Sequence, residues 1–125
     1  MKKWLFLFGL LIVFLAGCAS QNETEEELPF LDVKIVADEK VPLNKEVEIA
    51  CLVTYGNEKV TDADEVKFEV WKNGTENHEM IEGKHAGGGK YVIRKTFTEA
   101  GTYSIVAHVT ARSMHNMPKV EVTVE

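Results

Sequence analysis

The sequence has few cysteines, few basic residues and no long apolar stretch. Only 2 of its 125 residues are Cys, too few for the disulfide framework of a small secreted scaffold. Lys and Arg total 14 against 20 Asp and Glu, which argues against nucleic acid as a partner because phosphate contacts need a basic surface. No Gly-x-Ser-x-Gly, His-Glu-x-x-His or phosphate-binding glycine loop occurs, so the sequence does not predict an enzyme.

The N-terminal residues carry two lysines, an apolar run and a cysteine, in that order. Lys2 and Lys3 precede the run, and Leu15-Ala16-Gly17-Cys18 closes it. The run is shorter than the roughly 20 residues of a membrane-spanning helix, so we expect a cleaved signal peptide over residues 1–17. The residues Leu15-Ala16-Gly17-Cys18 resemble the lipobox of bacterial lipoproteins, which implies a diacylglyceryl lipid on the thiol of Cys18. Acyl chains would hold the mature chain at the extracytoplasmic face of the cell membrane, since each buried methylene adds about 0.8 kcal/mol.

The composition divides the mature chain into a tether and one domain. Residues 18–28 hold four glutamates among Gln, Asn and Thr, a composition typical of a solvated tether. Residues 29–125 are enough for a single compact domain and too few for two. Without the signal peptide, 12 Lys and Arg remain against 20 Asp and Glu, so we expect an acidic surface.

Alternating apolar and polar residues predict that the domain is all-β. In segment 120–124, Val-Glu-Val-Thr-Val, every second residue is apolar, as in a half-buried strand. Short turn sequences separate such segments, a spacing typical of an immunoglobulin-like antiparallel β-sandwich. The segments around Tyr91 and Tyr103 are expected to form a hairpin with Gly101 in its turn. We expect strands near residues 31–37, 46–54, 66–72, 90–97, 102–110 and 119–124, and a seventh within 75–86.

The same alternation assigns inward and outward side chains. Cys51 has the parity of the apolar residues in segment 47–53, so we expect a buried structural thiol. No disulfide is expected, because the lipid consumes Cys18. His108 falls on the face of segment 102–110 that lies opposite its core stripe.

All four histidines, and all methionines except Met1, fall between residues 78 and 117. Thioether sulfur favours Cu(I) and imidazole accepts Cu(I) or Cu(II), and neither depends on a thiolate that an oxidising compartment would destroy. Two His-x-Met pairs, at 78/80 and 115/117, each place nitrogen and sulfur on one side of an extended segment, and together they could complete a site. The predicted copper ligands are His78, Met80, His108, Met114, His115 and Met117.

A second interpretation needs no metal. Methionines fill gaps beneath loops, and Met114 and Met117 beside Pro118 would then cover one open end of the sandwich. His85 is the weakest ligand candidate, because three glycines leave its loop unrestrained. Two hypotheses therefore stand, a chaperone-like copper-binding domain and a surface-tethered protein-interaction module without metal. A single shared site fails if the two pairs lie more than about 10 Å apart with no way to converge, since bonds to metals are near 2 Å.

Three segments carry a resemblance to a known family. They are 88–91 (Gly-Gly-Lys-Tyr), 97–103 (Phe-Thr-Glu-Ala-Gly-Thr-Tyr) and 108–112 (His-Val-Thr-Ala-Arg). Together they resemble the YtkA-like domain of Bacillus-type lipoproteins, which is related to FixH-type domains, and this implies an extracytoplasmic immunoglobulin-like sandwich over residues 30–125. FixH-type proteins are linked to assembly of copper-containing cytochrome oxidases, and periplasmic chaperones of the PCuAC kind carry similar His/Met patterns. The resemblance therefore implies copper as the cofactor and an integral membrane copper protein as the partner.

Overall fold

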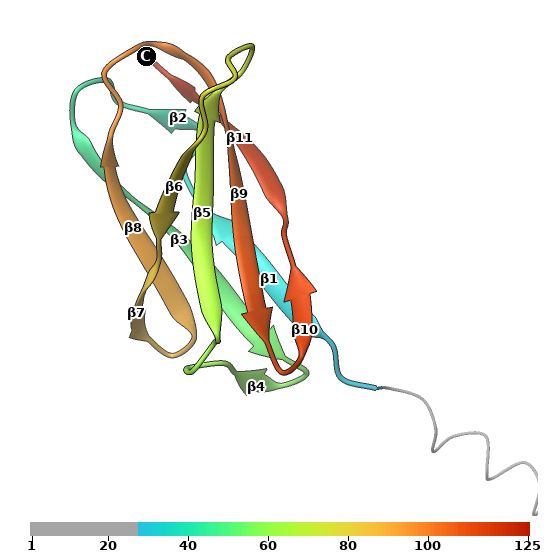
Figure 1. The fold of residues 1–125 in the computed structure, drawn as a ribbon. Helices are drawn as coiled ribbons and strands as arrows, with labels where there is room; N and C mark the ends of the chain where they lie inside the picture. The colour runs from blue at the N-terminus through green and yellow to red at the C-terminus, as the bar shows by residue number, and fades with distance from the viewer. Residues whose placement is uncertain (1–27) are drawn as a thin grey trace, which may run out of the picture.

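The computed structural model describes residues 28–125, and within that range it contains strands and turns but no helix (Figure 1). The predicted signal peptide, the lipidation site at Cys18 and the tether up to residue 27 lie outside the described residues. The strands are β1 Leu31–Val36, β2 Lys40–Val41, β3 Glu46–Tyr55, β4 Glu58–Lys59, β5 Glu65–Lys72, β6 Glu79–Glu82, β7 Lys84–Gly87, β8 Lys90–Thr96, β9 Gly101–Ala111, β10 Met114–Asn116 and β11 Lys119–Val124.

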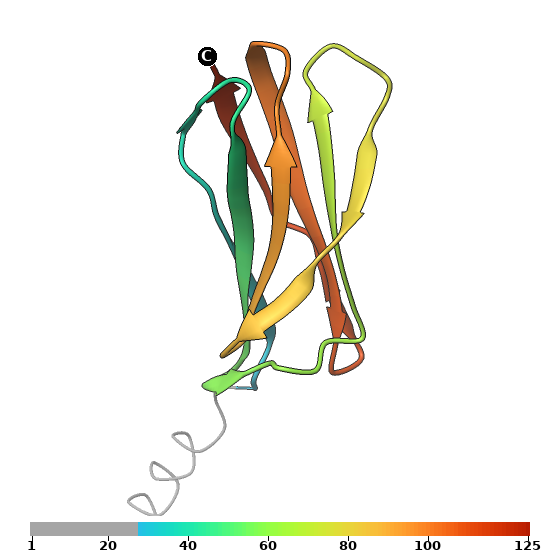
Figure 2. The same cartoon turned by 90° about the vertical axis from the view of Figure 1, so that its left-hand side faces the viewer.

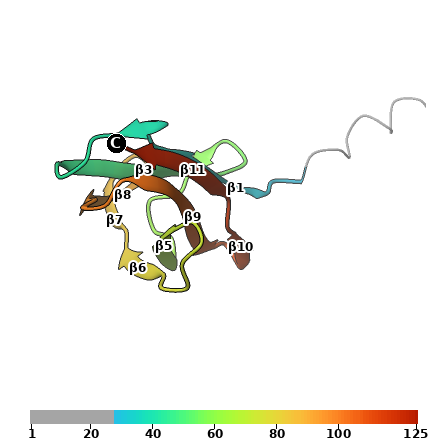
Figure 3. The same cartoon turned by 90° about the horizontal axis from the view of Figure 1, so that it is seen from above.

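These strands form two sheets that pack face to face, as Figures 2 and 3 show from the side and from above. The β3 sheet has the order β1-β3-β8-β7, with β4 attached to β3, and the β9 sheet has the order β2-β11-β9-β5-β6, with β10 attached to β9. All pairings are antiparallel except that of β2 with β11. The orders β1-β3-β8-β7 and β11-β9-β5 correspond to strands ABED and GFC of an immunoglobulin domain. The expected all-β, immunoglobulin-like sandwich is confirmed.

The six predicted strands are present, each with ends within about one residue of those expected from alternation. The irregular region 75–86 holds two short strands instead of one, and they belong to different sheets, because the chain crosses from β6 to β7 at Gly83. A side chain at Gly83 would meet the Val66 Cγ1 atom at 2.9 Å and the Phe68 Cε1 atom at 3.0 Å. Only glycine lets the crossing backbone lie this close to the core.

The core lies between the sheets and is built from alternate residues of each strand. Phe68 of β5, Ile105 of β9 and Ile49 of β3 are at most 1% exposed. Cys51 of β3 is fully buried among them, as predicted, and its thiol is free. Burial raises the pKa of its thiol to about 12, so Cys51 stays protonated and contributes as a small apolar side chain.

The expected hairpin between the segments around Tyr91 and Tyr103 is wrong. Strands β8 and β9 lie in different sheets, and residues 97–100 cross from one sheet to the other. Phe97 is buried there and packs edge-on against the Tyr103 ring, with centroids 4.7 Å apart, and the Tyr103 hydroxyl donates to the Glu99 carbonyl at 2.8 Å. This is the tyrosine corner of immunoglobulin-like sandwiches, in which a tyrosine early in strand F fixes the turn between the sheets.

Candidate metal centre

The outer face of the β9 sheet gathers most of the predicted ligands. Successive residues of a strand point to opposite faces, and residues paired across neighbouring strands share a face. Phe68 of β5 and Ala107 of β9 point into the core, so Glu69 and His108 point outward. Met80 of β6 is paired with Glu69 and lies on the same face. The outward position expected for His108 is confirmed.

Glu69 connects two of the histidines. One carboxylate oxygen, Oε1, lies 2.8 Å from His108 Nε2, and the other, Oε2, is hydrogen-bonded to His78 Nδ1. The hydrogen bonds from His78 and from His108 lower the pKa of the Glu69 carboxyl, so this group is a carboxylate at neutral pH. An ionised carboxylate only accepts, so the two nitrogens that face it donate. His78 Nε2 and His108 Nδ1 are left free for another partner.

At the β6 edge of this face, His78 stacks on an indole. The His78 and Trp71 ring centroids are 4.1 Å apart with an interplanar angle of 6°. Lys119 of β11 places its Nζ atom 5.7 Å from the Trp71 ring centroid. Stacking and the bond to Glu69 together fix the orientation of the His78 ring, while Met80 is 52% exposed beside it. We call His78 and Met80 the β6 group.

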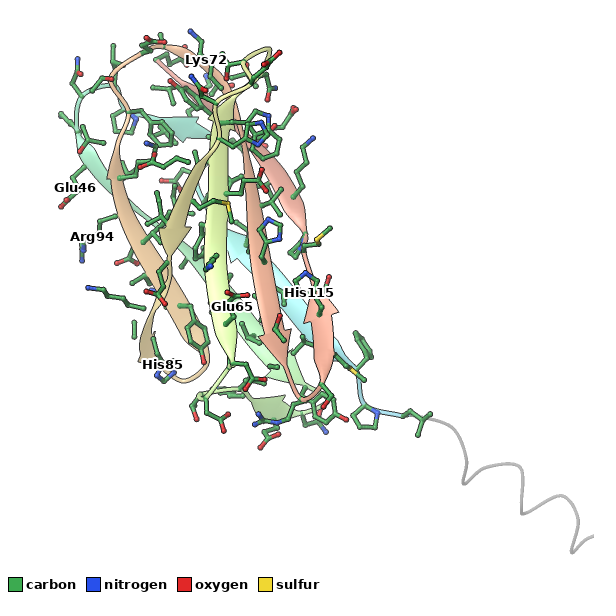
Figure 4. The ribbon with its side chains drawn as sticks, in the orientation of Figure 1. Glu46, Glu65, Lys72, His85, Arg94 and His115 are labelled. Carbon is green, nitrogen blue, oxygen red and sulfur yellow. The ribbon has the colours of Figure 1, made fainter. Side chains whose placement is uncertain are left out.

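At the opposite edge, His115 and Met117 flank His108. His115 is paired with Thr110, and its Nδ1 atom lies 2.9 Å from the Thr110 Oγ1 atom; Figure 4 shows its side chain on the outside of β10. The pairings Asn116 with Val109 and Lys119 with Val106 follow one continuous register.

The residues between these two pairings keep the same register. Met117 therefore lies opposite His108, and the bond from Ala107 N to Pro118 O at 3.1 Å supports this alignment. The ring centroids of His108 and His115 are 6.2 Å apart. We call His108, His115 and Met117 the β10 group.

The two His-x-Met pairs do not share one location. Strand β6 is separated from β10 and β11 by β5 and β9, which makes three strand spacings of about 4.8 Å, or about 14 Å. This separation exceeds the limit for two pairs that hold one ion, so the face carries two groups, with Glu69 and His108 between the pairs. Alternation in the sequence predicts the face of the sheet on which each residue lies. It does not predict the strand order, which separates the two His-x-Met pairs.

Two other histidine and methionine positions lie elsewhere. Met114 is paired with Ala111, whose side chain points into the core, so Met114 lies on the inner side of β10 and is 38% exposed there. His85 belongs to β7 of the other sheet (Figure 4), where its Nε2 atom accepts a hydrogen bond from Gly89 N at 3.2 Å. His85 thus stabilises the β7–β8 turn, and Met114 does not join the groups on the outer face.

Glu69 is a residue of this face that the sequence analysis does not predict. It has the same parity in β5 as Lys67 and Trp71, and β5 pairs with the strand of His108. Across residues 28–125 the structure holds no group of three or more His, Cys, Asp and Glu side chains that could hold a metal ion. The other donor atoms on this face are methionine sulfurs, which suit soft ions.

The fold and this face define a β-sandwich of immunoglobulin type with a histidine- and methionine-rich outer face. A family model described as YtkA-like matches residues 26–108. The chain belongs to the YtkA-like family, and the resemblance noted in the sequence is confirmed to that extent. No curated protein matches the chain in sequence.

Several solved structures share the fold. An engineered protein aligns with a TM-score of 0.56 at 21% identity, covering 78% of this chain but only 20% of its own, so the chain spans a fifth of that protein. The soluble domain of PmoD from Methylocystis sp. aligns with a TM-score of 0.50 at 9% identity, covering 81% of this chain and 95% of that one. A variant of superoxide reductase (neelaredoxin) from Ignicoccus hospitalis gives 0.51 at 14% identity, covering 83% and 91%. At these identities the likeness establishes the fold alone.

In residues 28–125 we find no helix with the length and apolar character required to cross a membrane.

Proposed function

We propose that this chain is an extracytoplasmic lipoprotein, anchored to the cell membrane through Cys18, whose domain binds copper and delivers it to an integral membrane copper protein. One observation carries the proposal: the outer face of the β9 sheet gathers three histidines and two methionines around a single carboxylate, Glu69. Thioether and imidazole ligands select copper among the ions of an oxidising compartment.

Glu69 supports this function through the histidines that it orients. Metal-binding imidazoles commonly donate their other N–H to a carboxylate, which fixes the tautomer and raises the basicity of the ligating nitrogen. His78 and His108 both face Glu69 with one ring nitrogen in this way. The side chain of Glu69 is 22% exposed and that of His108 is 23% exposed, so incoming ions can reach the face.

The anchor places this face near a membrane partner. Ten residues join Cys18 to Leu28, and a chain of that length extends to roughly 30 Å. The described chain enters the sandwich at the end where β10 lies (Figure 1), the strand that carries His115. A lipid on Cys18 would therefore hold the β10 end of the sandwich within reach of an integral membrane protein. The role proposed is binding and delivery, without catalysis and without nucleic acid.

The alternative is a tethered protein-interaction module that binds no metal. Its support is that Glu69 already satisfies one nitrogen on each of two histidines, and that Trp71 is held on the surface by His78 and Lys119. Orientated aromatic and imidazole groups on a flat sheet also suit a protein partner. The two functions differ in whether the free imidazole nitrogens have measurable metal affinity.

The test is a copper titration of the full chain in detergent, against a competing chelator and without oxygen. We expect tight Cu(I) binding in the wild type and its loss when His78, Met80, His115 and Met117 are all changed to alanine. A variant with Lys90→Ala and Arg94→Ala, on the outer face of the β3 sheet, is the matched control and should bind like the wild type. Wild-type affinity no better than that of a single surface histidine would leave the interaction module as the function. Separately, Cys18→Ala should release the protein from the membrane fraction.

A further inference from the structure

The two groups on the outer face differ in ligand number. The β6 group has one imidazole and one thioether, and its imidazole is stacked on Trp71. The β10 group has two imidazoles and one thioether. This difference determines which ion each group can hold.

We infer that the β10 group, His108, His115 and Met117, is a site for a monovalent soft ion, Cu(I), and that it discriminates against Zn(II) and Cu(II). The inference rests on the proposed copper function and specifies its ligands and oxidation state. The juxtaposition is set by the register, because Met117 lies opposite His108 and His115 lies two residues away on the same side of the strand.

The spacing of the two imidazoles suits a shared ion. A nitrogen–metal bond of about 2.0–2.1 Å puts a ring centroid about 3 Å from the ion, so two rings on opposite sides of it have centroids about 6 Å apart. The His108 and His115 centroids are 6.2 Å apart. The separation of the two rings therefore matches that of two imidazoles bound to one ion. A two-nitrogen arrangement completed by one sulfur is open on its remaining side.

The charges around the β10 group are two carboxylates and two lysines. Glu69 is hydrogen-bonded by His108 Nε2 and by His78. Lys67 is paired directly across from His108, and Lys119 follows Met117 at the next position on the same face. Glu65, the other nearby carboxylate on β5, forms an ion pair with Lys67 at 3.1 Å. Glu69 and Glu65 offset Lys67 and Lys119, so the preference of this group for an ion depends on its imidazole and thioether ligands.

Coordination number favours Cu(I) over a structural Zn(II) ion. Structural Zn(II) sites are almost always closed by four protein ligands, and the part of the chain that the structure describes has no cluster of three or more His, Cys, Asp and Glu side chains for one. Thioether sulfur favours Cu(I) over the harder divalent ions. The thioether of Met117 beside two imidazoles thus favours Cu(I), and a closed Zn(II) site would need a fourth protein ligand.

The test compares two matched double variants of the full chain in detergent. His115→Ala with Met117→Leu removes two ligands of the β10 group and keeps an apolar side chain at position 117, and His78→Ala with Met80→Leu makes the same changes in the β6 group. Cu(I) affinity is measured by chelator competition under ascorbate, and X-ray absorption at the copper edge counts nitrogen and sulfur neighbours. Circular dichroism checks that both variants fold.

We expect the first variant to lose at least a hundredfold in Cu(I) affinity and the second to stay within about threefold. Copper in the wild type should have two nitrogen and one sulfur neighbours, and Zn(II) should bind at least a hundredfold more weakly than Cu(I). Tight Cu(I) binding that is lost in the second variant instead, or Zn(II) binding as tight as Cu(I), would overturn the inference and leave the copper function standing. If the wild type has no tight Cu(I) binding, both the inference and the proposed function fail.

If the first variant does not fold, Met117→Leu alone decides the outcome. It removes only the sulfur, so we expect a loss of at least tenfold in affinity and the disappearance of the sulfur neighbour from the absorption spectrum. An unchanged spectrum overturns the inference.

Discussion

The two outer faces of this sandwich are built on the same strand geometry but carry different chemistry. On the β3 sheet, Lys90 pairs with Glu48 at 3.2 Å and Arg94 pairs with the same glutamate at 3.5 Å. These are long, exposed side chains of opposite sign, and their side chains are 39–62% exposed. On the β9 sheet, the central carboxylate of Glu69 is engaged by imidazoles, with His108 at 2.8 Å, and its side chain is 22% exposed.

The difference separates a surface of exposed ion pairs from an organised one. Exposed pairs of Lys or Arg with Glu contribute little to stability and are screened by salt, so the ion pairs on the face of the β3 sheet do not hold its side chains in fixed orientations. Glu69, by contrast, fixes two rings and leaves one free nitrogen on each. Exposed ion pairs do not require side chains held in one orientation, whereas the binding of a ligand does. Three predictions test this contrast.

The largest expected effect concerns the accessibility of sulfur. Cys51, in the β3 sheet, is buried with a thiol pKa of about 12, whereas Met80 and Met117, on the β9 sheet, are 52% and 56% exposed. Because only the thiolate reacts, the native Cys51 thiol at pH 8 should alkylate about a thousandfold more slowly than a free thiol of pKa about 8.5. Mass spectrometry of the Cys18→Ser variant, with Cys51 as its remaining thiol, follows the reaction.

Urea should restore the rate at Cys51, which serves as the control. In the same protein, mild peroxide should add one oxygen each to Met80 and Met117 while the fold is intact. Native labelling of Cys51 as fast as in urea would show that the core opens and that the contrast between buried and exposed sulfur does not hold.

A smaller effect is expected from removing the central carboxylate of each face. Glu69→Ala leaves two imidazole N–H groups without their acceptor, at a cost of about 1–3 kcal/mol in the free energy of unfolding. Glu48→Ala removes two exposed ion pairs and should cost less than about 1 kcal/mol. Urea denaturation measures the change in unfolding free energy of each variant, and the comparison holds when the variants and the wild type have equal m-values. Equal costs for the two variants would mean that Glu69 is no more organised than a surface ion pair.

The sequence predicted the sandwich because burial leaves a period-two record in each long strand. Cys51 and His108 were placed on the correct faces for that reason. The hairpin was wrong because alternation in two successive strands does not say whether they pair, and the corner depends on Phe97 and Tyr103 packing between sheets. Strands of two to four residues, such as β2 and β10, are too short to leave a periodic record.

The sequence predicts which types of residue make up the candidate site, but it does not predict which of these residues are neighbours. The sequence singled out His78 and His115, but pairing register and strand order decide which of the ligands are neighbours. Met114 was included because it is close in sequence, and the register turns it to the inner side of β10. Glu69 escaped notice because one glutamate among 20 Asp and Glu carries no compositional signal. Its role comes only from contact with histidines of two other segments.

The smallest expected effect concerns the turns that present the two faces. The β7–β8 turn beside the β3 sheet uses three glycines at positive φ, including Gly88 at 61°. The two-residue β9–β10 turn, which presents His115, places Arg112 at φ 51° and Ser113 at φ 64°, values that glycine adopts at lower cost. Ser113→Gly should therefore stabilise the domain by about 0.5–1 kcal/mol, which raises Tm by several degrees.

Differential scanning calorimetry measures this shift, and Gly88→Ser is the reverse change on the other sheet. An added Cβ at Gly88 would meet nothing within 4 Å, so only backbone strain acts, and Tm should fall by a similar amount. Arg112 is kept in both variants because its guanidinium lies 3.0 Å from Asp62 and 3.5 Å from Glu58, contacts that offset its strained backbone. If Ser113→Gly lowers Tm, the serine contributes an interaction that outweighs its conformational cost, and the β9–β10 turn is not a site of relievable strain.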